Sequence, residues 1–416
     1  MKKKILLALI IVVVLIGAGV AYAYFATDAF KTDKEMFFLH ISSGIFSESE
    51  SEKISEYMKK QEDMAYTNRG EISAKLDGNS DLITDEMKML NDSKISFDGK
   101  INNSKKLAEQ TITVDLQQGI NIPIKLRRDG EKIGLQSNLL DSKYIAIRND
   151  NLKALFKRFD IDTEEIPDKI DFEKNKFTEE EIQTLKNRYL KILDDNLEEE
   201  LFSKEKVDDQ TVIKLEMTDK KIVDISTKIL ETLRDDDIIL NKISEMVDKD
   251  EYQQKIDEEI EEIKDIETDN TNISEVKLYT KGKEINKITI KISSEDNKTI
   301  GQCDITKEVN GNDISCTINL KLETEDEEKV KLNAKIQYKN ILLLDNVEEN
   351  YKVKISMTDS YDEDANMEIS YKNQKTFSSD LEIDGLNSNN ATIINDATDE
   401  DLEELIMNIY TRLGMY

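Results

Sequence analysis

Hydrophobic residues recur at every second position in two long parts of the chain. The first part runs from Ile72 to Ile147 and the second from Val276 to Ile383, and the intervening positions are mostly polar or charged. A period of two places apolar side chains on one face of a β-strand and polar side chains on the other. Short polar turns such as Asp129-Gly130 separate the alternating stretches. The pattern therefore predicts two antiparallel meanders of half-buried strands.

Two capping boxes predict where long helices begin. Thr32 with Glu35, and Thr178 with Glu181, have the spacing in which a threonine hydroxyl and a glutamate satisfy the first free N–H groups of a helix. Apolar residues three and four apart follow each box, as expected for a helix with one buried face. The expected faces comprise Phe37, His40, Ile41, Ile45, Ile54, Tyr57 and Met58 after the first box, and Ile182, Leu185, Tyr189, Leu193 and Leu197 after the second.

Further helices are expected at 151–159, 222–233 and 252–263, and one more at the end of the chain. The last begins at Thr398, which is a good N-cap residue, and ends at Gly414, which can adopt the left-handed conformation of a C-terminal cap. Its apolar stripe comprises Leu402, Leu405, Ile406, Ile409 and Leu413. These stripes need partners, and the apolar faces of the predicted sheets are the nearest candidates.

The predicted fold class is α+β. We expect a large curved antiparallel sheet, or half-barrel, with helices packed on its concave face, because a pure sandwich would leave the helical stripes without a partner. No linker rich in Pro or Gly divides the chain, which favours one domain over two. Within it we place a first helix and meander at 32–148, a helical middle at 149–268, and a second meander with the C-terminal helix at 273–414.

The N-terminus predicts a membrane anchor that precedes this domain. Lys2, Lys3 and Lys4 are followed by an uncharged stretch, 5–26, which is long enough to span a bilayer as a transmembrane helix. Lysines on one side of such a segment favour a cytoplasmic location for that end. We therefore expect residues 1–4 in the cytoplasm, a single pass through the cell membrane, and 27–416 outside the cell.

A cleavable signal peptide is the alternative interpretation of the same segment. Ala21-Tyr22-Ala23 fits the small residues that signal peptidase accepts. Retention is favoured because the apolar run exceeds an ordinary signal-peptide core of about 7–15 residues, and because Tyr22, Tyr24 and Phe25 suit a membrane interface. Both interpretations export the rest of the chain.

The net charge of the chain limits the kinds of molecule that it can bind. The chain has 58 Lys and Arg against 88 Asp and Glu, which gives a formal net charge of −30. Such a charge repels phosphate backbones, so nucleic acid is excluded as a partner. It also repels anionic lipid head groups and wall polymers.

The layout resembles the LolA and LppX type of envelope lipoproteins and their Firmicute relatives anchored by a membrane helix. The segments that carry the resemblance are FKTDKEMFF at 30–38, which opens the first helix, and KYIAIR at 143–148 leading to Asn151-Leu152. The resemblance covers residues 32–416 and rests on element order. It implies that a lipid or another apolar molecule is held between a concave sheet and helices. The chain lacks a lipidated cysteine near its start, which implies a stationary role.

Catalytic chemistry finds little support in the sequence. The single histidine, His40, lies beside Phe37 and Ile41 on an apolar helix face, where a packed core residue is more common than a general base. The sequence contains no GxSxG, HExxH, P-loop or dinucleotide motif. We therefore expect no enzyme and no cofactor, with a wall-acting enzyme as the least favoured option.

Metal sites are also not expected. Asp359, Asp362 and Asp364 form one group of closely spaced oxygen ligands, and Asp77, Asn79 and Asp81 form another. Neither has the glycine and terminal glutamate of an EF-hand loop. Both are interpreted as polar turns. One histidine and two cysteines cannot fill a usual zinc site.

The two cysteines predict a disulfide. Cys303 and Cys316 are each two residues from an isoleucine, which places both thiols on the apolar face of neighbouring strands joined near Asn310-Gly311. Direct cross-strand opposition would allow a bond, and oxidation persists outside the membrane. Two buried free thiols are the alternative.

Together these observations predict a noncatalytic extracellular protein that binds a lipid or other apolar ligand between sheet and helices. The alternative is a structural or protein-interaction module of the cell envelope whose core is filled by its own side chains. The expected partners are the cell membrane, through the N-terminal helix, an apolar ligand, and an envelope protein.

Overall fold

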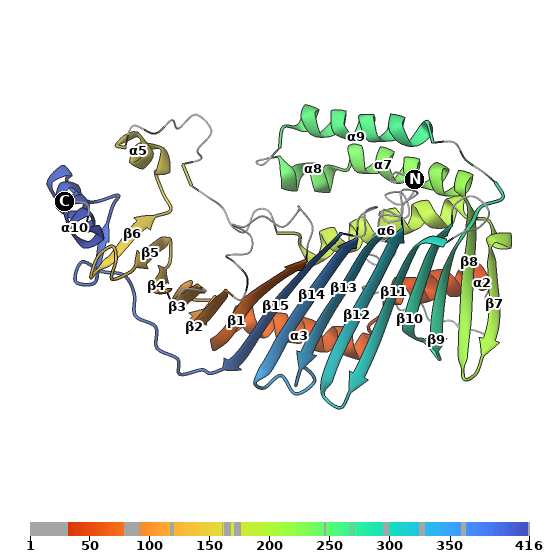
Figure 1. The fold of residues 1–416 in the computed structure, drawn as a ribbon, viewed down its shortest axis with the longest axis horizontal. Coiled ribbons are helices and arrows are strands. Elements are labelled where there is room, and N and C mark those ends of the chain that lie inside the picture. Colours follow the sequence, from red (N-terminus) through yellow and green to blue (C-terminus); the bar gives the residue numbers. More distant parts are fainter. Residues whose placement is uncertain are drawn as a thin grey trace.

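The computed structural model describes residues 32–78, 91, 93–116, 120–159, 161, 168–169, 176–244, 247–266, 268, 270–293, 299–323, 329–358 and 363–414. Within these ranges the chain forms one open sheet of sixteen strands together with helices (Figure 1). The predicted α+β class is confirmed. All strand pairs are antiparallel except β16 with β6, which is parallel.

The two predicted meanders join into a single sheet through their first and last strands. β1 (Ala65–Gly78) pairs with β15 (Asp364–Phe377) along almost its whole length, from Tyr66 opposite Phe377 to Gly78 opposite Ala365. The strand order is β16-β6-β5-β4-β3-β2-β1-β15-β14-β13-β12-β11-β10-β9-β8-β7. The remaining strands are β2 (Lys94–Asn102), β3 (Leu107–Leu116), β4 (Ile120–Asp129), β5 (Lys132–Gln136), β6 (Tyr144–Arg148), β7 (Phe202–Val207), β8 (Gln210–Thr218), β9 (Ile273–Lys281), β10 (Glu284–Ser293), β11 (Thr299–Asn310), β12 (Asp313–Glu323), β13 (Lys329–Lys339), β14 (Val347–Thr358) and β16 (Ala391–Ile393).

Most predicted helices are present with the predicted caps. Thr32, Thr178 and Thr398 each accept a hydrogen bond from the backbone N–H three residues on, and Gly414 ends the last helix with a φ of 67°. The helices are α2 (Asp33–Ser43), α3 (Glu48–Asp63), α5 (Leu152–Lys157), α6 (Glu179–Asn196), α7 (Asp219–Arg234), α8 (Asp237–Ile243), α9 (Lys249–Lys264) and α10 (Asp399–Leu413). A short 3₁₀ turn covers Glu199–Leu201.

The expected continuous face of the first helix is wrong, because this segment forms two helices. Gly44, with a φ of 78°, ends α2, and its N–H donates to the carbonyl oxygens of His40 and Ile41. A second capping box, Ser47 with Glu50, then starts α3. Met58 does not share the buried face and is 52% exposed.

One strand boundary and one edge strand also differ from expectation. The alternation at Leu381 and Ile383 does not continue β15, which ends at Phe377. Instead the chain passes to the far edge of the sheet and forms β16 beside β6. The sequence does not predict β7, an edge strand in which Phe202 alone is buried, because a strand exposed on both faces shows no alternation of apolar and polar residues.

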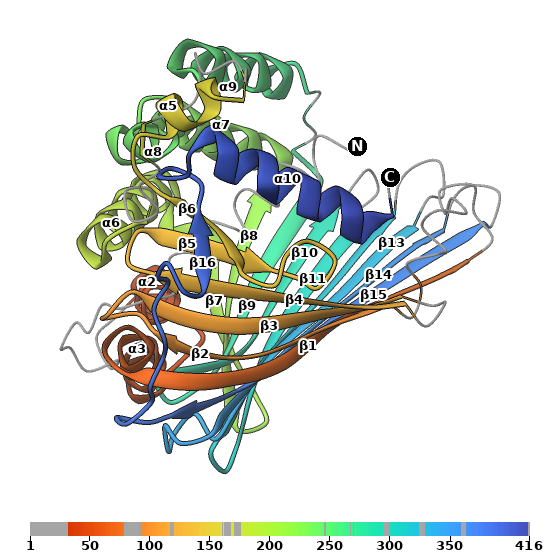
Figure 2. The same ribbon diagram turned by 90° about the vertical axis from the view of Figure 1, so that its left-hand side faces the viewer.

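The main core fills the space between α2, α6, α7, α9 and the strands from β8 to β12. Its fully buried members include Phe37, Leu193, Ile225, Ile263 and Leu278. Smaller clusters lie under α3 and between α5 and α10. Figure 2 shows α2 and α3 on one side of the strands and α10 near β6 and β16, while β13, β14, β15 and β1 extend well beyond α3.

The predicted membrane anchor at 5–26 lies outside the described residues. None of the helices in the described ranges combines the length and apolar character that a membrane crossing requires.

Candidate functional site

One face of the central strands is apolar and remains accessible. Across β13, β14, β15 and β1 the register places Ala334, Val353, Ile369 and Ala74 side by side. We call this surface the open face; it comprises the apolar side chains of β13 from Val330 to Ile336, β14 from Tyr351 to Met357, β15 from Met367 to Tyr371, β1 from Ile72 to Leu76, and Ile95 and Phe97 of β2. Its Ile72, Ile95, Ile336, Ile369 and Met357 side chains are between 36% and 41% exposed.

The opposite face of the same strands is charged. The Nζ atoms of Lys352 and Lys354 lie 2.7 Å and 3.0 Å from the carboxylate of Glu368. These hydrogen bonds, the one from Lys352 first, lower the pKa of Glu368 to about 2. One side of the sheet is thus suited to water and the other to apolar groups.

A row of aromatic rings crosses the open face at the end nearest α3. We call Tyr57, Tyr338, Tyr351, Tyr371 and Phe97 the aromatic row. Ring centroids are 6.3 Å apart for Tyr57 and Tyr338, 6.1 Å for Tyr338 and Tyr351, 5.1 Å for Tyr351 and Tyr371, and 5.9 Å for Tyr371 and Phe97. The Tyr351 and Tyr371 planes differ by 9°, so these rings stack. Such spacings favour ring–ring attraction, which orders the row.

Gly70 allows the row to cross β1. It lies between Asn373 of β15 and Phe97 of β2 in the register. A Cβ atom at this position would overlap the ring of Phe97 and the carbonyl oxygen of Lys372. The missing side chain therefore leaves the space in which Phe97 reaches Tyr371.

A buried ion pair lies at the polar end of the row. The Glu349 carboxylate accepts hydrogen bonds from Lys375 Nζ at 2.9 Å and from the Tyr57 hydroxyl at 2.9 Å. Asn373 donates to the same carboxylate at 3.4 Å. All four side chains are buried, and Lys375 Nζ also lies 2.6 Å from the Gln61 amide oxygen. Hydrogen bonds of this kind offset the cost of burying two charges.

Raising the pH above about 10, the ordinary pKa of tyrosine, is expected to destabilise the fold. Burial raises the pKa of Tyr371 to about 12 and also raises the pKa values of Tyr57 and Tyr351, with the negative charge of Glu349 contributing to each. In this window the unfolded chain has lost protons that the folded chain keeps, so stability falls as the pH rises from about 10 through 12. Urea unfolding of the full chain at about pH 9 and pH 11 measures the loss.

The variant Tyr371→Phe should lose less stability between these pH values than the wild type. The exposed Tyr410 provides the matched control, because Tyr410→Phe should leave the loss unchanged. A wild-type protein that is equally stable at both pH values would contradict the prediction.

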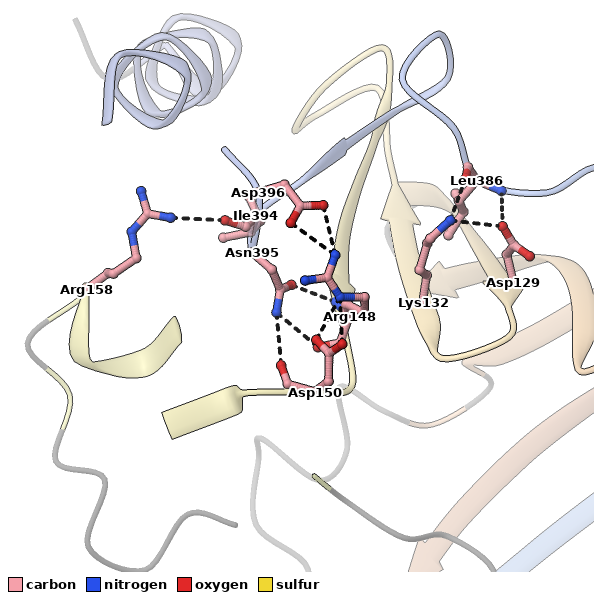
Figure 3. Close-up of polar contacts among 9 residues, drawn as sticks. All are labelled: Asp129, Lys132, Arg148, Asp150, Arg158, Leu386, Ile394, Asn395 and Asp396. Carbon is pink, nitrogen blue, oxygen red and sulfur yellow. Dashed lines mark hydrogen bonds and ion pairs between the residues drawn. The ribbon is translucent and has the colours of Figure 1, made fainter. Parts of the chain in front are cut away.

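A second polar cluster binds the segment that precedes α10 to the β6 edge of the sheet (Figure 3). Arg148, at the end of β6, contacts both carboxylate oxygens of Asp150 at 2.7 and 2.8 Å and both of Asp396 at 3.0 and 2.9 Å. The Asn395 side chain accepts from the Arg148 N–H at 2.7 Å and donates to the Arg148 and Asp150 carbonyl oxygens. The Asn395 side chain thus forms hydrogen bonds with backbone groups of Arg148 and Asp150, which lie past the end of the parallel β6–β16 pairing.

Further hydrogen bonds hold the chain near β16 against the same edge of the sheet. Arg158 donates to the Ile394 carbonyl oxygen at 3.3 Å, and Asp129 accepts from the Leu386 N–H at 3.0 Å (Figure 3). Lys132 Nζ donates to the Leu386 carbonyl oxygen at 3.2 Å. These contacts hold the segment before α10 in place, so we interpret the cluster as structural.

The predicted disulfide is wrong in this structure, although the predicted face is confirmed. Cys303 and Cys316 are both buried in the main core as free thiols. The hairpin turns at Gly311, between Asn310 and Asp313, and this register places Cys303 opposite Leu320 and Cys316 opposite Lys307. The two thiols are therefore offset by four positions, and burial raises the pKa of Cys303 to about 11.

His40 is buried, as expected for a core residue, and its Nδ1 lies 3.2 Å from the carbonyl oxygen of Lys283. Of the candidate calcium ligands, Asp77 lies in β1 and Asp364 begins β15. The other members of the two groups, Asn79, Asp81, Asp359 and Asp362, fall outside the described ranges. The residues that are described contain no group of three or more His, Cys, Asp or Glu side chains arranged to share a metal ion.

Neither the Glu349–Lys375 pair nor the aromatic row was predicted from the sequence. A usable signal was present, because Glu349 lies in phase with the apolar Val347 and Tyr351, and Lys375 lies in phase with Tyr371 and Phe377. Charged residues at positions that alternation assigns to the apolar face indicate a buried pair.

No family model matches the chain, and no curated protein matches it in sequence. Among solved structures, the chain is similar over 75% of its length to 76% of a Trp-176-Ala mutant of the vaccine antigen Transferrin Binding Protein B from Haemophilus parasuis, with 8% identity and a TM-score of 0.14. It is similar over 74% of its length to 98% of a mutant Rh. blastica porin, with 7% identity and a TM-score of 0.12. Neither similarity supports an assignment of family or function.

Proposed function

We propose that this protein is a noncatalytic, membrane-anchored module of the cell envelope that binds a lipid or another apolar ligand against the open face. The observation that carries the proposal is the exposure of the open face. Five of its large apolar side chains, on β13, β14, β15, β1 and β2, are more than one third exposed. Scattered exposed apolar residues are ordinary, but a contiguous patch of them is typical of a binding surface.

The proposal includes the finer shape expected from the sequence, a half-barrel with helices on its concave face. Support comes from the side chains that the helices cover. Tyr57 of α3 packs against Tyr338 and Phe377, whose side chains belong to the same face of the sheet as Tyr351 and Tyr371. The ligand would then lie on the same face as the helices, beyond α3.

The location outside the cell rests on the sequence. The uncharged segment 5–26 supplies the anchor, and the lysines before it orient the anchor with 27–416 outside. The resemblance to LolA and LppX proteins is compatible with this arrangement and with an apolar ligand.

Ile369→Glu is expected to weaken ligand binding strongly, because desolvating an ionised carboxylate against hydrocarbon without a partner is costly. Wild type and variant are purified identically as full chains, and the lipid that co-purifies is quantified by mass spectrometry. Lipid bound around the anchor contributes equally to both. Above that background the variant should retain roughly one fifth or less of the wild-type lipid, since a loss of 1 kcal/mol already lowers affinity about fivefold.

Lys372→Glu is the matched control, because Lys372 is an exposed residue of the same strand whose side chain lies on the charged face. It should retain the wild-type amount of lipid. Equal lipid in wild type, Ile369→Glu and Lys372→Glu, with none above the background, would contradict the proposed function.

A protein-interaction module is a second candidate, and α10 favours it. Leu402 and Leu405 are buried against α5, but Ile406, Met407 and Tyr410 on the adjoining side of the helix are at least 45% exposed. Crosslinking in the intact envelope tests this candidate; a protein partner whose binding survives delipidation would support it over the lipid-binding function.

A further inference from the structure

We propose that the aromatic row recognises the polar group of the ligand, and that this group is uncharged and carries a hydroxyl. The ligand class is therefore a neutral acylglycerol rather than a fatty acid or an anionic phospholipid. This inference rests on the proposed function and goes beyond it by assigning the head group and its orientation.

The row marks a boundary between polar and apolar side chains on one face. On β14, Tyr351 lies between Glu349 and Val353. On β15, Tyr371 lies between Asn373 and Ile369, and the register places Tyr351 opposite Tyr371. The polar and apolar ends of an amphiphile bound to this face can therefore contact side chains of matching polarity in only one orientation. Its hydrocarbon lies along Val353, Ile355 and Ile369, and its polar group lies at the tyrosines.

The polar side of this boundary offers hydrogen bonds to a neutral group. Tyr351 donates to the Tyr338 hydroxyl at 3.3 Å, which leaves the Tyr338 proton for an acceptor on a ligand. Asn373 is 3% exposed, and its amide oxygen has no hydrogen-bond partner among the described residues. A buried carbonyl oxygen without a donor is unfavourable, and a ligand hydroxyl would supply the missing donor.

Electrostatics at the same place disfavour an anion. Lys375 Nζ, which lies over the rings of Tyr57 and Tyr66, is already bonded to Glu349 and Gln61. Burial is the main cause of the raised pKa values of Tyr351 and Tyr371, and the negative charge of Glu349, which lies two positions before Tyr351 on β14, raises both further. A carboxylate or phosphate would meet the same repulsion, and the net charge of −30 adds to it.

The experiment compares two photoactivatable probes with the same acyl chain and the same diazirine: a monoacylglycerol and the free fatty acid. Full-chain protein in membranes is irradiated with each probe, and crosslinked peptides are quantified by mass spectrometry. The monoacylglycerol should crosslink to β13, β14 and β15 at least roughly fivefold more than the fatty acid, as expected when an ion must be desolvated next to like charge.

The double variant Tyr351→Phe/Tyr371→Phe keeps both rings and removes both hydroxyls. It should lower the preference for the monoacylglycerol to roughly twofold or less, while crosslinking of the acyl chain to β14 persists. Tyr279→Phe on β9, outside the row, should keep the wild-type preference.

The outcomes separate the two proposals. Equal crosslinking of both probes to the open face in the wild type would overturn the head-group inference and leave the proposed function standing. Absence of crosslinking by either probe to the open face would overturn the proposed function itself. Stronger crosslinking by the fatty acid would overturn the electrostatic argument.

Discussion

Replacing Glu349 with alanine is expected to lower the free energy of unfolding by about 3–5 kcal/mol, the range found when one partner of a buried ion pair is removed. The change leaves the buried Lys375 ammonium without its carboxylate and removes the acceptor of the Tyr57 hydroxyl. The bond from Lys375 to Gln61 offsets only part of this loss, because an amide oxygen carries no net charge. Urea denaturation of the full chain in detergent, followed by circular dichroism, measures the effect.

Glu368→Ala is the matched control for this prediction. Glu368 pairs with Lys352 and Lys354 on the neighbouring strand, at similar distances but in contact with solvent. Exposed pairs typically contribute about 0–1 kcal/mol, so this variant should unfold close to the wild type. A Glu349→Ala variant no less stable than Glu368→Ala would contradict the assignment of a buried pair.

Phe37→Ala is expected to lower the free energy of unfolding by about 3–5 kcal/mol, because it leaves a cavity in the main core. Phe37 of α2 is fully buried, and its ring lies 5.3 Å from that of Phe202 and 5.7 Å from that of Phe38. These rings attach α2 to the β7 edge of the sheet. The same urea denaturation measures the loss.

Phe159→Ala makes the same chemical change at a side chain that is 44% exposed. It opens no closed cavity and should alter stability by less than about 1 kcal/mol. Equal losses for the two phenylalanine variants would show that α2 does not pack as described.

Local signals in the sequence predicted much of the fold. A capping box depends on residues three apart, so Thr32, Thr178 and Thr398 mark helix starts whatever the rest of the chain does. Period-two alternation likewise depends on a single strand. It correctly assigned the Cys303 and Cys316 side chains to the buried face.

The register between strands, and which strands the helices cover, could not be predicted in the same way. Alternation looks identical after any shift of two positions, so it placed Cys303 and Cys316 on one face but could not exclude an offset of four. Ile290 and Ile369 likewise show the same alternation in the sequence, yet one is buried under helices and the other is exposed on the open face. Which strands a helix covers is decided by packing between distant segments.

The pairing of β1 with β15 has a consequence for the order in which the protein assembles. β1 ends at Gly78 and its partner is complete only at Phe377, so roughly 300 residues, or about 15–60 seconds of synthesis, separate the two. Throughout that interval one side of a fourteen-residue strand has unpaired N–H and C=O groups, which can template aggregation. A nascent chain of this protein is therefore expected to require a holdase until its last long strand emerges.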